Sequence, residues 1–232
     1  MCGRATLTKT PKEMEQRLQL TFELAIADLV NQVLPTYNIA PTHLHPVVTQ
    51  QEERQLQLFK WGLIPSWTKS AAIGSRLINA RIETITEKPA FRAIHKKRCL
   101  VPLDGFYEWK KVGKTKTPYR IVLKDQSIFC AAGIWEQWKD ATGKTVFSFT
   151  ILTQPPNPLL ATIHNRMPAI LLPEQESLWL DHTLPTKEVL ELIHPYPDDL
   201  MEVYPVSPRV GKVSNNDASL IERDIPRQGT LF

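Results

Sequence analysis

Short segments with the two-residue period of a β-strand recur through most of the chain. The run QLQLF at residues 55–59 alternates in the manner typical of a strand with one buried face. Other apolar and β-branched runs lie between clusters of Pro, Gly, Asn or charged residues, which mark turns. We predict strands over residues 45–49, 54–62, 98–103, 118–123, 127–135 and 146–152.

Helical signals are fewer and irregularly spaced. A helix should start at Thr10, which can serve as N-cap, with Pro11 in the first turn and Glu13 closing a capping box. We expect a few helical turns from there, before the β-rich pattern begins after Asn31. Shorter helices are predicted over residues 87–95, 158–163, 173–180 and 186–193, the last with a cap-like Thr186. Segments 62–78 and 211–232 are predicted to be extended and without secondary structure.

The order of these elements defines a fold class. Strands dominate, and the absence of a regular strand–helix alternation argues against a doubly wound parallel sheet. The 232 residues, 42% of them hydrophobic, suffice for one large core, and no linker or internal repeat divides them. We therefore predict a single α+β domain with a mostly antiparallel, barrel-like β-sheet core and peripheral helices.

Composition and cysteine usage indicate the cellular location and the redox state that we expect for the protein. Residues 1–20 lack the apolar core of a secretory signal, and no stretch approaches 18 apolar residues, so we expect a cytoplasmic protein without a membrane partner. Cys99 and Cys130 lie in apolar runs and are predicted to be reduced core residues. The formal net charge of +4 is compatible with a polyanionic partner without demanding one.

The cysteine at position 2 changes this picture. If Met1 is removed, Cys2 carries an amine and a thiol on one Cα, with reference pKa values of about 7.7–8.0 and about 8.5. An aldehyde can form a Schiff base with that amine, and the thiol can then close a thiazolidine ring. The alternative is that position 2 is merely where translation starts, which Met-Cys alone leaves open.

Two further side chains are candidates for proton transfer. Glu108 lies between Tyr107 and Trp109 after a Gly turn, a setting that should desolvate its carboxylate, although an exposed strand carboxylate fits equally well. His164 is the one histidine of six set in a polar cluster with an arginine. None of the six has metal-ligand spacing, so we expect neither a metal nor another cofactor.

Seven blocks of sequence, taken together, resemble one known family. In chain order they are MCGR, YNIAPT, WGLIPSW, NARIET, KPAFR, RCLVPLDGFYEWKK and IHNRMPAILL. They are similar to the SRAP (SOS-response-associated peptidase) family, also called abasic site processing proteins. The resemblance runs over residues 1–222 and implies one SRAP domain there, followed by a flexible tail at residues 223–232. Asn165 departs from it, since an acidic residue is more usual after the histidine.

The resemblance implies a chemistry for the terminal cysteine. Members of the family covalently capture abasic sites in single-stranded DNA, whose open-chain sugar is an aldehyde, and protect the lesion from strand cleavage. By similarity, Cys2 supplies both nucleophiles of the thiazolidine and Asn79 orients the reacting sugar and amine. Glu108 would assist ring opening and proton transfer, and His164 would shuttle protons and promote reversal. The family also removes its own initiator methionine, hence the name peptidase.

Residue types suggest how the strand is held. Pro41 and Trp67 are apolar wedges that can stack on bases beside the lesion, and Asn38 and Met167 are expected to line the same channel. Trp61, in contrast, is predicted to pack in the core. Three arginines can contact phosphates in bidentate fashion: Arg4, Arg81 and Arg166.

Two other classes of function remain open. Cys2 could be the nucleophile of a thiol peptidase or N-terminal-nucleophile hydrolase with His164 as base. The protein could also bind single-stranded or modified DNA without covalent chemistry. In each case we expect a monomer in a bacterial cytoplasm, associated with the nucleoid when bound to damaged DNA. A final prediction concerns the tail, where Gln228, Leu231 and Phe232 resemble a pentapeptide that docks on the sliding clamp.

Overall fold

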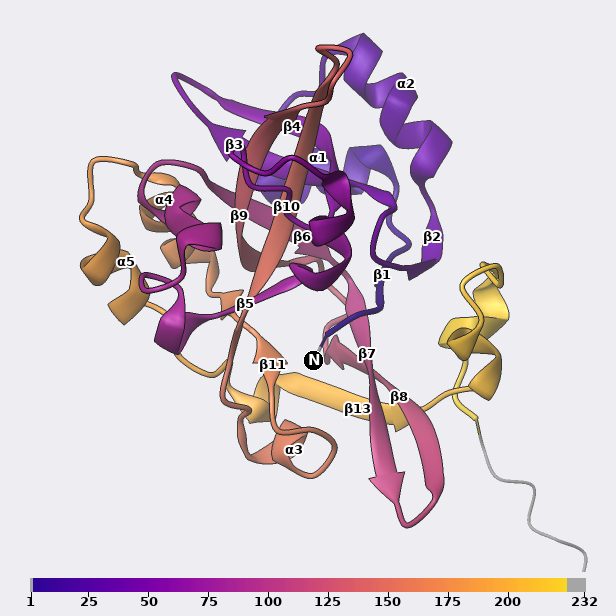
Figure 1. Cartoon of the computed structure of the whole chain (residues 1–232). Coiled ribbons are helices and arrows are strands. Elements are labelled where there is room, and N and C mark those ends of the chain that lie inside the picture. The colour runs from indigo at the N-terminus through magenta and orange to yellow at the C-terminus, as the bar shows by residue number, and fades with distance from the viewer. Residues whose placement is uncertain (1, 225–232) are drawn as a thin grey trace, which may run out of the picture.

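A closed five-stranded β-barrel forms the centre of the computed structural model, which describes residues 2–224 (Figure 1). Its strands are β3 (Leu44–Gln50), β4 (Arg54–Trp61), β6 (Arg98–Leu103), β9 (Phe129–Lys139) and β10 (Thr145–Gln154). Neighbours pair antiparallel in the order β4–β3–β6–β9–β10. A ring with an odd number of strands needs at least one parallel pair, and here β4 and β10 close the barrel in parallel through Lys60 and Trp61. The predicted mostly antiparallel barrel is confirmed.

Three very short strands extend the barrel. β5 (Asn79–Arg81) lies parallel to β10, β11 (Met167–Pro168) pairs antiparallel with the end of β10, and β12 (Ile170–Leu171) pairs with β9. They were not predicted, because two or three residues carry no readable period. Two of them bring candidate site residues to the same end of β10.

A second, antiparallel sheet packs beside the barrel (Figure 1). Its strands, in spatial order, are β13 (Met201–Pro205), β8 (Thr115–Leu123), β7 (Gly105–Val112), β1 (Ala5–Leu7) and β2 (Thr36–Ile39). The chain passes from β6 in the barrel to β7 in this sheet through Asp104 alone. Residues near that junction therefore belong to both layers.

Helices lie around the two sheets. The α-helices are α1 (Pro11–Leu18), α2 (Leu24–Val33), α3 (Pro158–Ala161), α4 (Pro173–Leu180) and α5 (Thr186–Glu191). Short 3₁₀ helices cover Ala71–Arg76, Ile82–Thr84, Pro89–His95, Asp198–Leu200, Pro208–Gly211 and Ala218–Ile221. No helix within residues 2–224 is both long and apolar enough to cross a bilayer.

The helix start at Thr10 is confirmed, but the first helix is shorter than expected. Thr10 and Glu13 make both hydrogen bonds of the capping box. The helix ends where Gln19 adopts a left-handed conformation with φ of 53°, and α2 then starts separately at Leu24. A favourable cap fixes where a helix begins, and the chain direction after it is decided by packing.

Four local predictions were wrong. Segment 62–78, predicted to be without secondary structure, contains the 3₁₀ helix Ala71–Arg76. Residues 89–95 form a 3₁₀ helix broken at Phe91, whose φ and ψ of −112° and 16° are not helical. Thr186 is the first residue of α5 and not its cap, since Pro185 occupies that position. Segment 211–224 is not simply extended, because Leu220 is fully buried and Val206 bridges to Arg223. The clamp-like residues of the tail lie outside the described residues.

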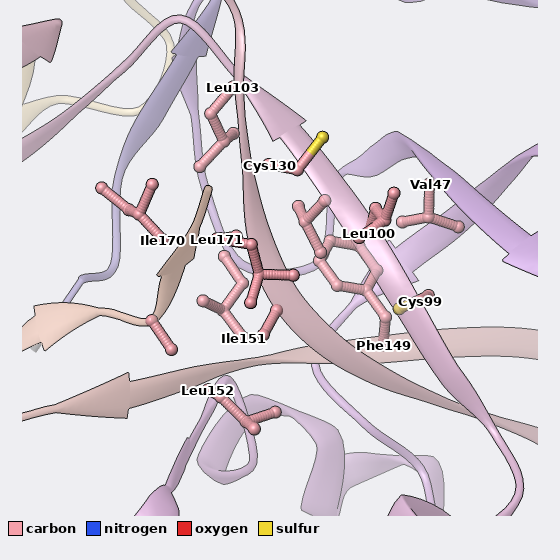
Figure 2. Packing of buried hydrophobic residues seen from close by; sticks show 14 of the residues in the cluster. Val47, Cys99, Leu100, Leu103, Cys130, Phe149, Ile151, Leu152, Ile170 and Leu171 are labelled. Carbon is pink, nitrogen blue, oxygen red and sulfur yellow. The ribbon is translucent and has the colours of Figure 1, made fainter. Parts of the chain in front are cut away.

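The barrel interior is packed with aliphatic, aromatic and thiol side chains (Figure 2). A Cβ on Gly133 would approach Cys99 Sγ and Val101 Cγ2 to 2.9 Å, so glycine is needed for strand β9 to pass there. Cys99 and Cys130 are buried free thiols, and burial raises the pKa of both, as expected for inert core residues. Trp61 is also buried, with Nε1 donating to the Ile78 carbonyl at 2.9 Å.

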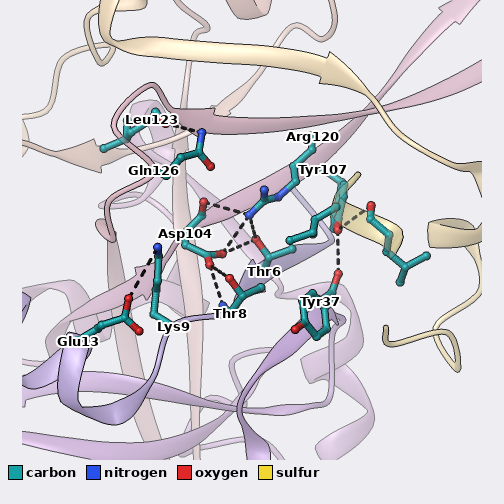
Figure 3. A network of polar contacts seen from close by, with 12 residues as sticks. Thr6, Thr8, Lys9, Glu13, Tyr37, Asp104, Tyr107, Arg120, Leu123 and Gln126 are labelled. Atoms are coloured by element: carbon teal, nitrogen blue, oxygen red, sulfur yellow. Dashed lines mark hydrogen bonds and ion pairs between the residues drawn. The ribbon is translucent and has the colours of Figure 1, made fainter. Parts of the chain in front are cut away.

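A buried polar network fixes β1 against the junction of the two layers (Figure 3). Asp104 Oδ1 accepts from Thr6 Oγ1 at 2.5 Å, and Oδ2 accepts from the backbone N–H of Thr8 at 2.8 Å and from its hydroxyl. Arg120 Nη2 forms an ion pair with Asp104 at 3.4 Å, while Nη1 donates to Tyr204 Oη at 2.8 Å. One carboxylate thus ties β1 to both sheets.

Replacing Asp104 by Asn should lower the free energy of unfolding by about 3 kcal/mol, because Arg120 loses its charged partner in a buried site. Denaturant titration measures this change. Asp28→Asn, at an exposed position on α2, is the control and should change the free energy by less than about 0.5 kcal/mol. Equal stabilities of the two variants would show that the Asp104 network does not hold the layers together.

Candidate active site

Strand β1 delivers Cys2 to the space between the barrel and the second sheet (Figure 1). Ala5 pairs with Phe106 on β7, and the N–H of Tyr107 donates to the Arg4 carbonyl at 3.0 Å, so the residues before β1 run alongside Glu108. Cys2 is completely buried. A residue so near a chain end is normally mobile, and here the β1 pairings and the Asp104 network hold it in place.

Asn79 holds the backbone of Cys2 from the barrel side. It starts β5, where it lies opposite Ile151 of β10, and its Nδ2 donates to the Cys2 carbonyl at 2.7 Å. Its Oδ1 is buried, and no residue between 2 and 224 donates to it. Since an unpaired buried acceptor is costly, this oxygen is suited to bind a donor on a ligand or on the terminal amine.

Glu108 and His164 form a pair on the other side of the site. Glu108, on β7, is 3% exposed, and its Oε2 lies 3.9 Å from His164 Nε2. The backbone N–H of Arg166 donates to His164 Nδ1 at 3.1 Å, so that nitrogen is the acceptor. In neutral His164 the proton therefore resides on Nε2, which faces Glu108. This hydrogen bond helps to orient the ring.

The thiol of Cys2 is kept protonated. Burial raises its pKa far above the usual range, and the negative charge of Glu108 raises it further. Sγ makes a weak hydrogen bond, 3.8 Å long, to the Arg4 carbonyl. In this arrangement Cys2 is a poor free thiolate nucleophile at neutral pH.

A pocket of about 510 Å³ opens beside the Glu108–His164 pair. Four of its lining residues were not singled out from the sequence: Trp109, Lys111, Lys116 and Gly211. Lys111 and Lys116 face each other across the β7–β8 hairpin, an unfavourable pairing of like charges that an anion would relieve. The clustered lysines of KKVGKTK after the GFYEW block were the available signal.

Arg4 and Asn38, predicted to contact DNA, hold a wall of this pocket. Arg4 Nη1 donates to Asn38 Oδ1 at 2.8 Å and to the Val210 carbonyl at 2.6 Å, and Nη2 donates to the Gly211 carbonyl at 3.1 Å. Asn38 is buried and donates to the carbonyls of Val210, Lys212 and Asn215. Both side chains position the segment that carries Gly211, and their DNA contacts stay a prediction.

Arg166 and Met167, where β11 begins, both point into the protein. Arg166 Nη1 and Nη2 donate to the Glu83 carboxylate at 2.5 Å and 2.9 Å, and Nη2 also donates to the Thr153 carbonyl at 2.6 Å. Met167 is completely buried, and its sulfur accepts from the Asn157 N–H at 3.3 Å. Met167 therefore packs in the core and is not exposed along a channel.

Trp67, Pro41 and Arg81 are more accessible. Trp67 is 52% exposed on a loop whose two neighbours are fixed, since Ser66 Oγ donates to Glu136 at 3.3 Å and Trp138 Nε1 donates to the Thr68 carbonyl at 2.7 Å. Pro41 is half-buried and Arg81 is exposed. Trp67 is thus an apolar side chain held rigidly toward solvent, the arrangement expected of a stacking platform.

The structure therefore brings together Cys2, Asn79, Glu108 and His164, with Arg81 and Arg166 near one end of β10. Among residues 2–224, no group of three or more His, Cys, Asp or Glu side chains is arranged to hold a metal ion. What the four residues offer is a buried aminothiol terminus once Met1 is removed, beside a carboxylate and an imidazole that can exchange a proton.

Comparison with known proteins assigns this chain to a family. The family model for SOS response associated peptidase (SRAP) matches residues 1–213, and the chain belongs to this family. The abasic site processing protein YoqW of Bacillus subtilis is 40% identical over 226 residues, spanning 96% of this chain and 99% of YoqW. The abasic site processing protein HMCES of Xenopus tropicalis is 30% identical over 93% of this chain and 76% of its own length.

A solved structure supports the same assignment of the fold. A crystal structure of a protein from Bacteroides thetaiotaomicron superimposes with a TM-score of 0.88 at 34% identity, covering 97% of this chain and all of that chain. The α+β single-domain fold with its five-stranded barrel is therefore that of the family.

Replacing Glu108 by Gln should lower the pKa of the Cys2 thiol, because the negative charge that raises it is removed while burial remains. We expect alkylation of Cys2 at a fixed, mildly alkaline pH to become faster, because a larger fraction of the thiol is then deprotonated. Mass spectrometry of peptides after timed iodoacetamide treatment measures the rate. Cys99, whose pKa is raised by burial, is the internal control. An unchanged Cys2 rate would show that the Glu108 charge does not act on the thiol.

Proposed function

We propose that this protein captures abasic sites in single-stranded DNA by forming a thiazolidine between the open-chain sugar and Cys2, after removal of Met1. The observation that carries the proposal is the meeting of a buried Cys2 with Asn79 on one side and the Glu108–His164 pair on the other. The names of the relatives, abasic site processing proteins, point to the same substrate.

The order of the two bond-forming steps follows from the state of the thiol. The amine of Cys2 first attacks C1′ of the ring-opened sugar, and the resulting carbinolamine loses water to give a Schiff base. Sγ then adds to the same carbon, and its proton passes to the nitrogen as the ring closes. Because burial keeps the thiol protonated, the sulfur becomes reactive only when an acceptor for its proton is at hand.

Glu108 is placed to be that acceptor. Its charge acts on the Cys2 thiol. In the earlier steps the same carboxylate can take the proton of the anomeric hydroxyl and give it to the ring oxygen during opening, and then take the proton released by the attacking amine and give it to the departing hydroxyl of the carbinolamine. His164 presents Nε2–H to Glu108 and can restore its protonation state from solvent. Asn79 holds the Cys2 carbonyl and has a spare acceptor for the amine or a sugar hydroxyl.

The surroundings of the site suit a single strand of nucleic acid. Lys111 and Lys116 supply positive charge to the pocket that Glu108 and His164 line, and Trp109 adds an aromatic face. Exposed Trp67 and Arg81 add a second stacking surface and a further cation. Aromatic faces interleaved with basic groups bind single strands through stacking and phosphate contacts.

A thiol peptidase with Cys2 and His164 as a catalytic dyad fits less well. Such enzymes need a lowered thiol pKa and a base in contact with the sulfur. Here burial raises the pKa of Cys2, and His164 Nε2 faces Glu108. A single intramolecular cleavage of the Met1–Cys2 bond is included in our proposal, and it agrees with the word peptidase in the description of the family.

A non-covalent reader of single-stranded DNA is the other candidate. The basic and aromatic residues around the pocket would be enough for it. It gives no reason for Asn79 to hold the Cys2 backbone in a buried position next to a carboxylate.

Variants of Cys2 test the proposal. Wild-type protein mixed with an abasic oligonucleotide should give an adduct that survives denaturing electrophoresis. Cys2→Ser keeps the amine but cannot close the sulfur ring, so we expect an adduct only after borohydride reduction of the Schiff base. Intact mass spectrometry should also show that Met1 is absent from the reactive wild-type chain.

Cys2→Ala separates the candidates, because it too keeps an amine and lacks sulfur. If it formed a stable adduct without reduction, as the wild type does, thiazolidine formation would be wrong. If Cys2→Ala bound the oligonucleotide as tightly as the wild type, and the wild type formed no adduct, the non-covalent reader would be favoured. Cleavage of unrelated peptides by the wild type would favour the thiol peptidase.

A further inference from the structure

Arg166 was expected to bind a phosphate, yet its guanidinium is already occupied. Its two arms grip the carboxylate of Glu83 at 2.5 Å and 2.9 Å, in the parallel geometry that guanidinium also adopts with phosphate. The Arg166 side chain is 11% exposed, whereas that of Glu83 is 42% exposed. The carboxylate therefore covers the arginine from the solvent side.

The setting of this ion pair is cationic. Glu83 lies two residues after β5, in the 3₁₀ helix Ile82–Thr84, and Arg81, the last residue of β5, pairs in register with Thr153 of β10. The Thr153 carbonyl accepts from Arg166, so two arginines and one carboxylate surround this point of the strand. Hydrogen bonds from Arg166 hold the pKa of Glu83 below its usual value, and the carboxylate stays charged at neutral pH.

The same arginine is connected to the catalytic pair. Its backbone N–H donates to His164 Nδ1, and His164 Nε2 faces Glu108. A ligand that draws the Arg166 side chain away from Glu83 therefore acts on the segment that fixes the His164 ring. The ion pair thus lies between the solvent, which Glu83 faces, and the Glu108–His164 pair.

We propose that Glu83 is an internal substitute for a DNA phosphate: it holds the Arg166 guanidinium in the free protein and is displaced by a phosphodiester beside the abasic sugar. The inference rests on the function proposed above. Glu83 then determines specificity for DNA over small anions, because an isolated anion has to compete with Glu83 for Arg166 without any other contact to the protein. A DNA strand brings further contacts to Trp67, Lys111 and Lys116 that offset the displacement.

Replacing Glu83 by Gln tests the inference in otherwise intact protein. The probe is a single-stranded oligonucleotide carrying a tetrahydrofuran analogue of the abasic sugar, which has no aldehyde and cannot crosslink. Fluorescence anisotropy should show binding tightened by about three- to ten-fold, because a half-exposed competing charge is removed. The slope of log affinity against log salt should stay close to that of the wild type, because the phosphate reaches Arg166 in both proteins and the number of phosphate contacts is the same.

Two controls separate this mechanism from a general charge effect. Glu87→Gln removes an equal charge from an exposed position four residues away and should change the affinity much less. In an Arg166→Gln background, Glu83→Gln should add nothing, because the competition acts through Arg166. Thermal unfolding of each variant shows whether the fold is retained.

The outcomes are distinguishable from those of the capture proposal. If wild-type protein neither binds the analogue nor crosslinks to abasic DNA, both proposals fail. If wild-type protein crosslinks but Glu83→Gln binds no more tightly than Glu87→Gln, Glu83 is a structural partner of Arg166 and this inference is overturned. A slope steeper by about 0.7 in Glu83→Gln would overturn it too, because the phosphate would then reach Arg166 only in the variant.

Discussion

Asp104 fixes the first strand to the junction of the two β-layers, and the position of Cys2 depends on that attachment. β1 has three residues, too few to stay in a sheet through its own ladder alone. The carboxylate adds acceptors for Thr6 and Thr8 on β1, and its ion pair with Arg120 reaches the next strands of the second sheet. A chain end that would otherwise fray thus becomes a rigid part of the site.

Burial then gives the terminal thiol its chemical character. A low thiol pKa would favour oxidation and unspecific alkylation, whereas burial beside Glu108 keeps this sulfur protonated. In the capture that we propose, the sulfur reacts only after a Schiff base has formed on its own amine, and this requirement for two successive bonds selects aldehydes. Asn79 holds Cys2 from the barrel and the Glu108 charge acts on it from the second sheet, so both layers contribute to the site.

Most of the longer strands could be predicted from sequence because their signals are local. Strands β3, β4, β6, β8, β9 and β10 each contain a full apolar or alternating run, whereas the eight-residue β7 was missed because polar residues interrupt its pattern. The very short strands exist because a neighbouring strand offers hydrogen bonds, and nothing within two or three residues reveals that.

The candidate site residues divide in a similar way. Residue types alone pointed to Cys2, Glu108 and His164, and the family resemblance added Asn79. The inward direction of Met167 and the pairing of Arg166 with Glu83 depend on tertiary contacts.

The short parallel pair that closes the barrel leaves part of one strand edge open on the outer surface. β4 joins β10 through Lys60 and Trp61, so within residues 2–224 the first part of β4 has a strand neighbour on one side and a groove of about 450 Å³, lined partly by α2, on the other. An open strand edge is a template for pairing with another chain. Helix α2 lines this groove and packs against β4, so it leaves less of the strand edge open to such pairing.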